Sequence, residues 1–242
     1  MLIGPQNSPA VADLASRYRA VRARIAAAAA ASGRNEDCVT LLAVSKGRDA
    51  AAVQAMAQLG VENFGENYLQ DALPKLTALA GMELTWHYIG RLQANKTRAI
   101  AEHFAWVHSV DRLRTAERLA AQRPHFAAPL NVCVQLRLTA STERSGATAA
   151  ELPALLASVA ALPRLRLRGL MCMLPDGLAP AQQLAQFAEV RALYDRLNRD
   201  GAGLDTLSMG MSGDFEVAIA AGSTMVRIGT ALFGERPVAE GA

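Results

Sequence analysis

The sequence predicts an α/β fold, a single (β/α)8 barrel of the TIM type spanning residues 1–242. Three observations lead to this prediction. Short apolar runs alternate eight times with segments of helical periodicity. No change of composition and no low-complexity linker divides the chain. Its 242 residues are close to the roughly 250 that such a barrel uses. Eight parallel strands with right-handed crossovers favour closure, and an open doubly wound sheet is the alternative.

The first strand is expected at residues 39–46, VTLLAVSK, a mostly apolar run bounded on both sides by polar clusters. Such a run suits a strand that is buried on both faces. Lys46 therefore falls at the carboxyl end of the strand. There it is either a solvated strand terminus or an amine held in the mouth of a site.

An additional helix is expected before this strand. Ser8 followed by Pro9 is typical of a helix start, and apolar residues then recur at spacings of three and four. These residues are Val11, Leu14, Tyr18, Val21 and Ile25. The arginines of the segment fall mostly off this stripe, so we expect an N-terminal helix that packs on the barrel and has a basic outer face.

Helices and strands then alternate along the rest of the chain. Asp49 and Asp111 are expected to cap helices, because their carboxylates accept hydrogen bonds from free backbone N–H groups. The later strands are expected at residues 61–64, 84–89, 106–110, 130–138, 165–173, 204–209 and 225–228. The helices are expected at residues 49–59, 68–79, 95–103, 111–122, 148–162, 180–198 and 214–221, before a short fraying tail at 231–242.

Composition and charge exclude several classes of protein. The hydrophobic fraction of 51%, the charged fraction of 19% and the net charge of +3 describe a globular protein and do not predict nucleic-acid binding. Cys38, Cys133 and Cys172 lack close pairing, which argues against a disulfide framework and for a reducing cytoplasm. We find no signal peptide, no run long enough to span a membrane, and no histidine and cysteine spacing typical of a zinc site. We therefore expect a cytoplasmic protein that binds neither nucleic acid nor membrane.

The segment 208–214, SMGMSGD, is expected to join the seventh strand to a helix. Its glycines allow a ligand to approach the backbone, and its serines and the helix N-terminus offer hydrogen-bond donors to an anion. The eighth strand runs into Gly229 and Thr230, and phosphate sites of barrels recur after strands seven and eight. Taken separately, Ser212 is a helix cap and Gly229 a turn; taken together, they predict a phosphate site.

Arg227 lies two residues before Gly229, where strand alternation can point it into the barrel mouth. A buried arginine needs acceptors, so the alternative is an ion pair with Glu62 or Glu66. A lysine, a phosphate site and an inward arginine at one face indicate pyridoxal 5'-phosphate (PLP). Its aldehyde condenses with a lysine amine, its phosphate takes N–H and hydroxyl donors, and its ring nitrogen takes a protein partner.

Six ordered blocks carry a resemblance to a known family. They are residues 43–46 (AVSK), 64–68 (FGENY), 86–90 (WHYIG) with 92–93 (LQ) and 95–96 (NK), 168–171 (RGLM), 207–212 (LSMGMS) and 221–230 (AGSTMVRIGT). With these blocks the chain resembles the YggS/PROSC-type pyridoxal phosphate homeostasis proteins, which look like the barrel domain of alanine racemase standing alone. The resemblance covers nearly all of the chain beyond residue 39.

The resemblance implies a set of cofactor-binding residues. They are Lys46, Asn67, Ile89, Met209, Ser212, Arg227, Gly229 and Thr230. The lysine would hold PLP as a Schiff base, and the serine, glycine and threonine would hold its phosphate. The arginine would face the ring nitrogen, where its charge disfavours protonation and makes the ring a weaker electron sink.

The sequence departs from the family pattern at three places. Arg137 stands where the family usually has asparagine, Ala94 replaces a common serine, and residues 47–49 read GRD in place of a threonine, lysine and proline run. None of these changes removes a predicted site residue. Arg137 either adds charge to the pocket or turns to solvent.

The resemblance implies a monomeric PLP carrier of intracellular homeostasis rather than an enzyme, with apo PLP-dependent enzymes as its recipients. Racemisation by the two-base route needs an acid or base on each face of the substrate. The sequence offers no convincing second catalytic group, which agrees with a carrier. One alternative is a racemase-like PLP enzyme that uses Tyr68, Tyr88 or His87, although packing in the barrel also explains these rings. The other is a cofactor-free Schiff-base aldolase on a phosphorylated sugar.

Overall fold

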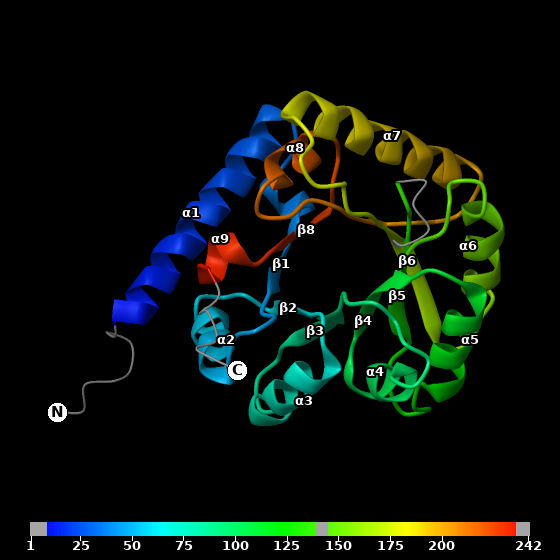
Figure 1. Ribbon diagram of the computed structural model, residues 1–242, viewed down its shortest axis with the longest axis horizontal. Coiled ribbons are helices and arrows are strands. Elements are labelled where there is room, and N and C mark those ends of the chain that lie inside the picture. The colour runs from blue at the N-terminus through cyan, green and yellow to red at the C-terminus, as the bar shows by residue number, and fades with distance from the viewer. Residues whose placement is uncertain (1–8, 139–144, 236–242) are drawn as a thin grey trace.

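The computed structural model describes residues 9–138 and 145–235 and shows a closed barrel of eight parallel strands in sequence order, surrounded by helices (Figure 1). The strands are β1 (Thr40–Val44), β2 (Asn63–Glu66), β3 (Thr85–Tyr88), β4 (Trp106–Val110), β5 (Leu130–Gln135), β6 (Leu165–Met171), β7 (Thr206–Ser208) and β8 (Met225–Ile228). β1 pairs with β8, so the ring closes and the predicted barrel is confirmed. The open doubly wound alternative is wrong.

The outer helices alternate with the strands. They are α1 (Pro9–Ala31), α2 (Ala50–Gln58), α3 (Leu69–Ala78), α4 (Thr97–His103), α5 (Leu113–Gln122), α6 (Leu152–Ala160), α7 (Pro180–Arg199), α8 (Phe215–Ala220) and α9 (Thr230–Phe233), with a single 3-10 turn, η2 (Glu36–Cys38), before β1. In the part of the chain that the structure describes, no helix is both long and apolar enough to cross a membrane.

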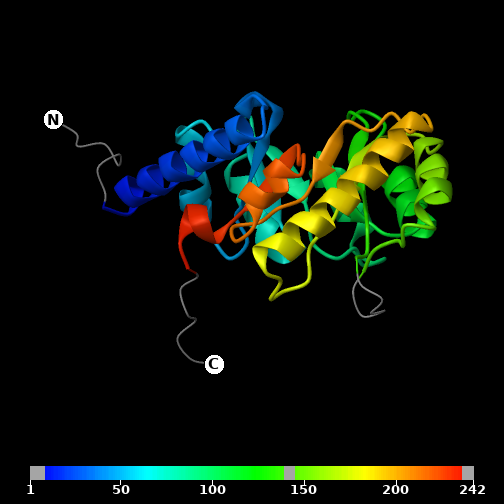
Figure 2. The same cartoon turned by 90° about the horizontal axis from the view of Figure 1, so that it is seen from above.

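The expected N-terminal helix is present and packs on the barrel. α1 lies beside α8 and α9 (Figure 2), and Val21, Ile25 and Ala29 are buried along its inner side. The basic face is not wholly outward, because the guanidinium of Arg24 pairs with Glu216 at 2.5 Å and lies over the ring of Phe215. The predicted Ser8 cap lies outside the described residues.

Most element boundaries fall within two residues of the predicted ones, but β2 lies two residues later than predicted and β5 ends at Gln135, three residues before its predicted end. β4 and β8 begin and end where predicted, and Asp49 caps α2 through Ala52 N–H at 2.8 Å. Arg112, not Asp111, is the N-cap residue of α5. α6 begins at Leu152 rather than at residue 148, because the Glu151 carboxylate accepts hydrogen bonds from Thr148 and holds it in a turn. The predicted fraying tail begins instead with α9.

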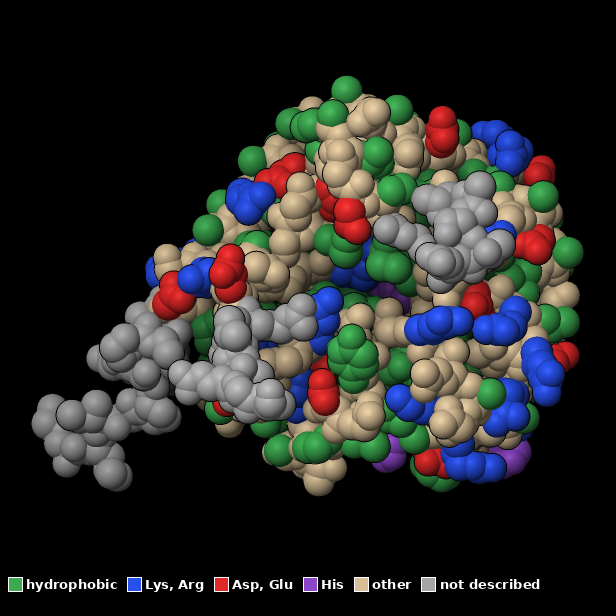
Figure 3. Space-filling model, in the orientation of Figure 1, with side chains coloured by type: hydrophobic (Ala, Val, Ile, Leu, Met, Phe, Trp, Pro, Cys, Tyr) green, Lys and Arg blue, Asp and Glu red, His purple; other side chains and the backbone are tan. Residues whose placement is uncertain are grey.

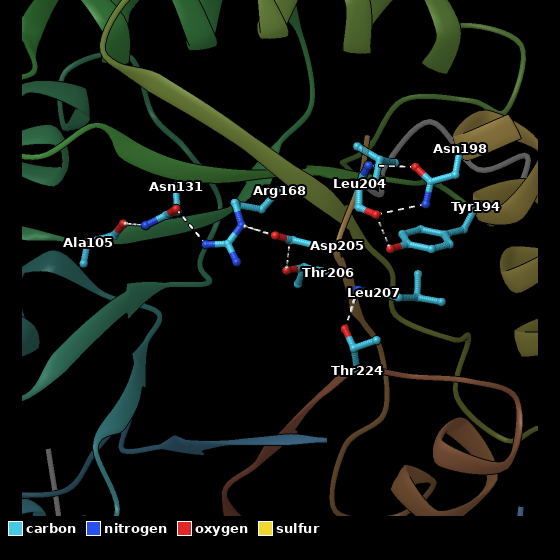
Figure 4. Close-up of polar contacts among 10 residues, drawn as sticks. All are labelled: Ala105, Asn131, Arg168, Tyr194, Asn198, Leu204, Asp205, Thr206, Leu207 and Thr224. Carbon is cyan, nitrogen blue, oxygen red and sulfur yellow. Dashed lines mark hydrogen bonds and ion pairs between the residues drawn. The ribbon is translucent and has the colours of Figure 1, made fainter. Parts of the chain in front are cut away.

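A polar network ties together the amino-terminal ends of the later strands. Figure 4 shows Arg168 between Asn131 and Asp205, with nitrogen to oxygen distances of 2.9 Å and 2.8 Å. The guanidinium of Arg168 also lies 4.5 Å from the centre of the Trp106 ring. These contacts tie β4, β5, β6 and the start of β7 together at the amino-terminal end of the barrel.

Candidate functional site

A cavity of about 290 Å³ lies at the carboxyl ends of the strands. Figure 3 shows this face of the molecule hollowed near its centre, with basic side chains at the hollow. Seven of the eight predicted site residues line the cavity: Lys46, Asn67, Ile89, Ser212, Arg227, Gly229 and Thr230. The structure thus brings together residues from the ends of five strands, and the volume is near the lower end of the roughly 300–1,000 Å³ typical of small-molecule pockets.

Met209 is the predicted residue that the structure places elsewhere. Its side chain is buried in the main hydrophobic core, and Met211 lines the cavity in its place. β7 ends at Ser208, and Gly210 then turns the chain with a positive φ of 98°, so strand alternation no longer tells which methionine faces the ligand.

Lys46 lies two residues beyond β1 and is half-buried at the edge of the cavity. Gly47 follows with a φ of 70° and turns the chain away from the barrel. Lys46 has no hydrogen bond or ion pair with any residue that the structure describes. Its amine is therefore available to a ligand in the cavity.

The backbone of Lys46 rests on a buried ion pair that the sequence did not reveal. Lys75 Nζ donates to Glu66 Oε1 at 2.6 Å and to the carbonyl oxygen of Ser45 at 2.8 Å, and the Ser45 hydroxyl donates to the same carboxylate oxygen at 2.5 Å. Burial raises the pKa of Glu66, and its hydrogen bond to Lys75 opposes that rise. A lysine on the buried side of α3 was the available signal for this pair.

The predicted phosphate site is a cluster of donors between the β7 and β8 ends. The hydroxyl oxygen of Ser212 accepts long hydrogen bonds from Gly229 N–H at 3.4 Å and Ala231 N–H at 3.3 Å, at the start of α9. A Cβ on Gly229 would lie 3.2 Å from the carbonyl oxygen of Val44, so glycine lets this turn approach β1 closely. The groups that could donate to an anion here are the Ser212 hydroxyl and the N–H groups at the start of α9.

Asp214 lies in the loop beside this donor cluster and takes up one of its backbone N–H groups. The carboxylate of Asp214 accepts from Met211 N–H at 2.6 Å, within the loop that precedes α8. Burial raises the pKa of Asp214. The cavity lining contains Ser212, Gly229 and Thr230 but no residue of α8, so the candidate donors lie at Ser212 and at the start of α9 rather than at the N-terminus of α8.

Arg227 is buried, with 4% of its surface exposed. Its Nη1 donates to the carbonyl oxygen of Ser208 at 2.7 Å and to its hydroxyl oxygen at 2.9 Å, and its Nη2 donates to the carbonyl oxygen of Cys172 at 2.8 Å. The alternative ion pair with Glu62 or Glu66 is wrong, because these acceptors are all uncharged. Burial lowers the pKa of Arg227, and its charge faces the cavity without a hydrogen bond to any carboxylate among the described residues.

The three candidate acid or base residues do not line the cavity. His87 bonds inside the barrel to Asn63 and His108, both at 3.0 Å. The Tyr88 hydroxyl donates to the carbonyl oxygen of Arg91 at 3.2 Å, and Tyr68 is 55% exposed. The lining therefore offers Lys46 as the group suited to attack a carbonyl.

Arg137 lines an adjoining cavity of about 400 Å³, which shares Asn67, Ile89, Met173 and Met211 with the first. Its Nε is buried without a hydrogen-bond partner, as is Oδ1 of Asn67. Arg137 therefore adds charge beside the site rather than turning fully to solvent. Among the described residues, no group of three histidine, cysteine, aspartate or glutamate side chains is arranged to hold a metal ion.

Comparison with known proteins gives consistent matches. The family model described as "Alanine racemase, N-terminal domain" matches residues 16–237. The chain is 53% identical to the pyridoxal phosphate homeostasis protein of Pseudomonas aeruginosa over 93% of this chain and 97% of the relative. It is 46% identical to the protein of that name from Escherichia coli K12, again over 93% and 97%.

Solved structures match as well. PipY of Synechococcus elongatus with PLP bound is 37% identical, with a TM-score of 0.81, 91% of this chain covered and 100% of PipY. The alanine racemase of Clostridium difficile has a TM-score of 0.72 at 15% identity, over 94% of this chain and 58% of the racemase, and shows a likeness of fold alone.

Proposed function

This chain belongs to the alanine racemase N-terminal domain family, within which it groups with the pyridoxal phosphate homeostasis proteins, and we propose that it binds PLP and serves in PLP homeostasis. The fold neighbour PipY, which holds PLP, supports this function. We also propose that the cofactor binds in the cavity at the carboxyl ends of the strands.

The observation that carries the proposal is the set of groups that converges on this cavity. Three features of the cavity match the three polar parts of PLP. They are a lysine amine that is unpaired among the described residues, a cluster of N–H and hydroxyl groups, and a buried arginine to which no described carboxylate bonds. When bound, PLP supplies an aldehyde that reacts with amines and a ring that can withdraw electrons. Lys46 would bind the aldehyde, the donors around Ser212 would bind the phosphate, and Arg227 would face the ring nitrogen.

The same residues favour a carrier over a catalyst. Arg227 keeps a fixed positive charge at the ring, which opposes protonation of the ring nitrogen and so weakens electron withdrawal. A racemase also needs an acid or base on each face of its substrate, and His87, Tyr68 and Tyr88 lie outside the cavity lining. We infer that the protein stores PLP as a monomer in the cytoplasm and passes it to apo PLP-dependent enzymes.

The experiment is reconstitution of the purified protein with PLP. We expect a visible absorption band that wild-type protein acquires and Lys46→Ala lacks, because the alanine cannot bind the aldehyde. A protein that stays colourless, or an unchanged band in Lys46→Ala, would refute the proposed site. Turnover of any member of an amino-acid panel, in either stereochemistry, would replace the carrier by an enzyme.

Two further measurements test the proposed monomeric state and the proposed transfer of PLP to apoenzymes. Size-exclusion chromatography with light scattering should give the mass of one chain. Transfer of PLP to an apoenzyme should be faster than release into buffer containing a PLP trap; equal rates would refute direct transfer.

A further inference from the structure

A chain of polar side chains runs through the barrel interior to the proposed cofactor cavity. Asn63 Oδ1 lies 3.0 Å from His87 Nε2, and His87 Nδ1 lies 3.0 Å from His108 Nε2. His108 Nδ1 lies 3.1 Å from Ser208 Oγ, which accepts from Arg227 Nη1 at 2.9 Å. Five strands contribute one residue each, and Arg227 is the member that lines the cavity.

The amide oxygen of Asn63 at one end of the chain fixes the direction of the hydrogen bonds along it. The oxygen of Asn63 can only accept, so His87 Nε2 carries the hydrogen. A neutral imidazole has one N–H, so His87 Nδ1 accepts from His108 Nε2. His108 Nδ1 is then an acceptor, and the Ser208 hydroxyl donates to it. At the other end, Arg227 can only donate, which agrees with this direction.

Burial keeps both imidazoles neutral. His87 and His108 are fully buried, and the ring of Trp106 stacks on His87 with centroids 5.2 Å apart. Desolvation lowers the pKa of His87 to about 3. Desolvation, followed by electrostatic interaction with His87 and Arg227, holds the pKa of His108 well below its ordinary value. The described carboxylates make none of the hydrogen bonds of this chain.

We propose that His108 and Ser208 are positioning residues of the cofactor site, which set the direction in which Arg227 presents its guanidinium to the cofactor ring. This inference rests on the proposed function. A serine hydroxyl can rotate and either donate or accept. Because His108 takes the hydroxyl hydrogen, the lone pairs of Ser208 face Arg227 and add a side-chain acceptor to the two backbone carbonyls that hold its guanidinium. His87 and Asn63 in turn fix the tautomer of His108.

The first test needs no cofactor. Long-range proton–nitrogen spectra of the apoprotein labelled with nitrogen-15 histidine report which ring nitrogen carries hydrogen. We expect His87 and His108 to show protonated Nε2 and bare Nδ1, unchanged from about pH 6 to about pH 8. A protonated Nδ1, or an imidazolium, at His108 would overturn the proposal.

The second test measures PLP binding. His108→Phe should raise the Kd about fivefold, the worth of one hydrogen bond, and shift the absorption band of bound PLP. His108→Gln, which keeps a donor and an acceptor, should recover part of both, and His103→Phe on the exposed end of α4 should change neither. An unchanged Kd and band in a folded His108→Phe protein would overturn the proposal.

Ser208→Ala tests the same hydrogen bond from its other side. If His108→Phe does not fold, Ser208→Ala removes the hydroxyl while the carbonyl of residue 208 still accepts from Arg227, and the same loss of affinity is expected. Normal PLP binding by Ser208→Ala would overturn the proposal. Failure of the wild-type protein to bind PLP refutes the proposed function instead, and the tautomers measured in the apoprotein remain a separate result.

Discussion

Replacing Lys75 with methionine should destabilise the protein strongly and in a manner that depends on pH. The side chains of Lys75 and Glu66 are 7% and 0% exposed, and Glu66 Oε2 already lacks a partner. Methionine keeps the apolar stem but leaves Glu66 with the Ser45 hydroxyl as its remaining partner. Removing one member of a buried ion pair costs about 3–5 kcal/mol, which corresponds to a Tm lower by roughly 10 °C in a chain of this size.

The pH dependence follows from the raised pKa of Glu66. Loss of Lys75 raises this pKa further, so the native protein holds the Glu66 proton more tightly than the unfolded chain. The contribution of Glu66 to the stability of Lys75→Met should therefore be fully present at or below the unfolded pKa of about 4.3 and be lost as pH rises through the native pKa. The deficit relative to wild type should be smaller at about pH 5 than at about pH 7.5.

Urea unfolding at both pH values measures the effect, and two variants serve as controls. Glu66→Gln combined with Lys75→Met should recover more than half of the loss, because no buried charge remains. Arg98→Met breaks an exposed pair with Glu102, whose atoms are 4.0 Å apart, and should stay within about 0.5 kcal/mol of wild type. A Lys75→Met loss below about 1 kcal/mol, or one that is equal at both pH values, would refute this reasoning.

Three other predictions concern packing, acid stability and the anion site. A Cβ on Gly169 would lie 1.6 Å from the carbonyl oxygen of Thr206, so Gly169→Ala should lower the free energy of unfolding in urea by about 3 kcal/mol. Gly81 has open space around it, so Gly81→Ala should leave that free energy nearly unchanged, and equal losses in the two variants would contradict this prediction. Since the pKa of His87 is about 3 when folded and about 6.5 when unfolded, stability should fall from about pH 6.5 downward by up to about 1.4 kcal/mol per pH unit, and His87→Gln should flatten this slope. An unaltered slope in that variant would exclude His87 as its source. Ser212→Ala should raise the Kd for PLP about fivefold in a fluorescence titration, and an unchanged Kd would remove Ser212 from the site.

The barrel and the face that carries the cavity could be predicted from the sequence because both follow from local patterns. Apolar runs mark the strands, and each parallel strand ends at the same face of a barrel. Lys46, Asn67 and Ile89 each follow a strand, so their common location needed only the topology. The exchange of Met209 for Met211 could not be predicted, because it depends on a left-handed turn at Gly210 beyond the end of β7.

Partners that come from distant elements could not be read from the sequence. Arg227 bonds to backbone carbonyls on neighbouring segments, and any residue type carries such an acceptor, so the sequence offered only carboxylates as candidates. The pairing of Lys75 with Glu66 depends on how α3 packs against the ends of β1 and β2. Only residue positions in space decide such contacts.

The central claim is that Lys46 is the amine that binds the aldehyde of PLP, and the sequence makes its test unusually direct. The chain has three lysines, Lys46, Lys75 and Lys96, and Lys75 is buried in an ion pair. Borohydride reduction of the PLP-loaded protein, followed by peptide mapping with mass spectrometry, should find the pyridoxyl group on Lys46. A label on Lys96, on Lys75 or on the N-terminal amine in place of Lys46 would contradict the account.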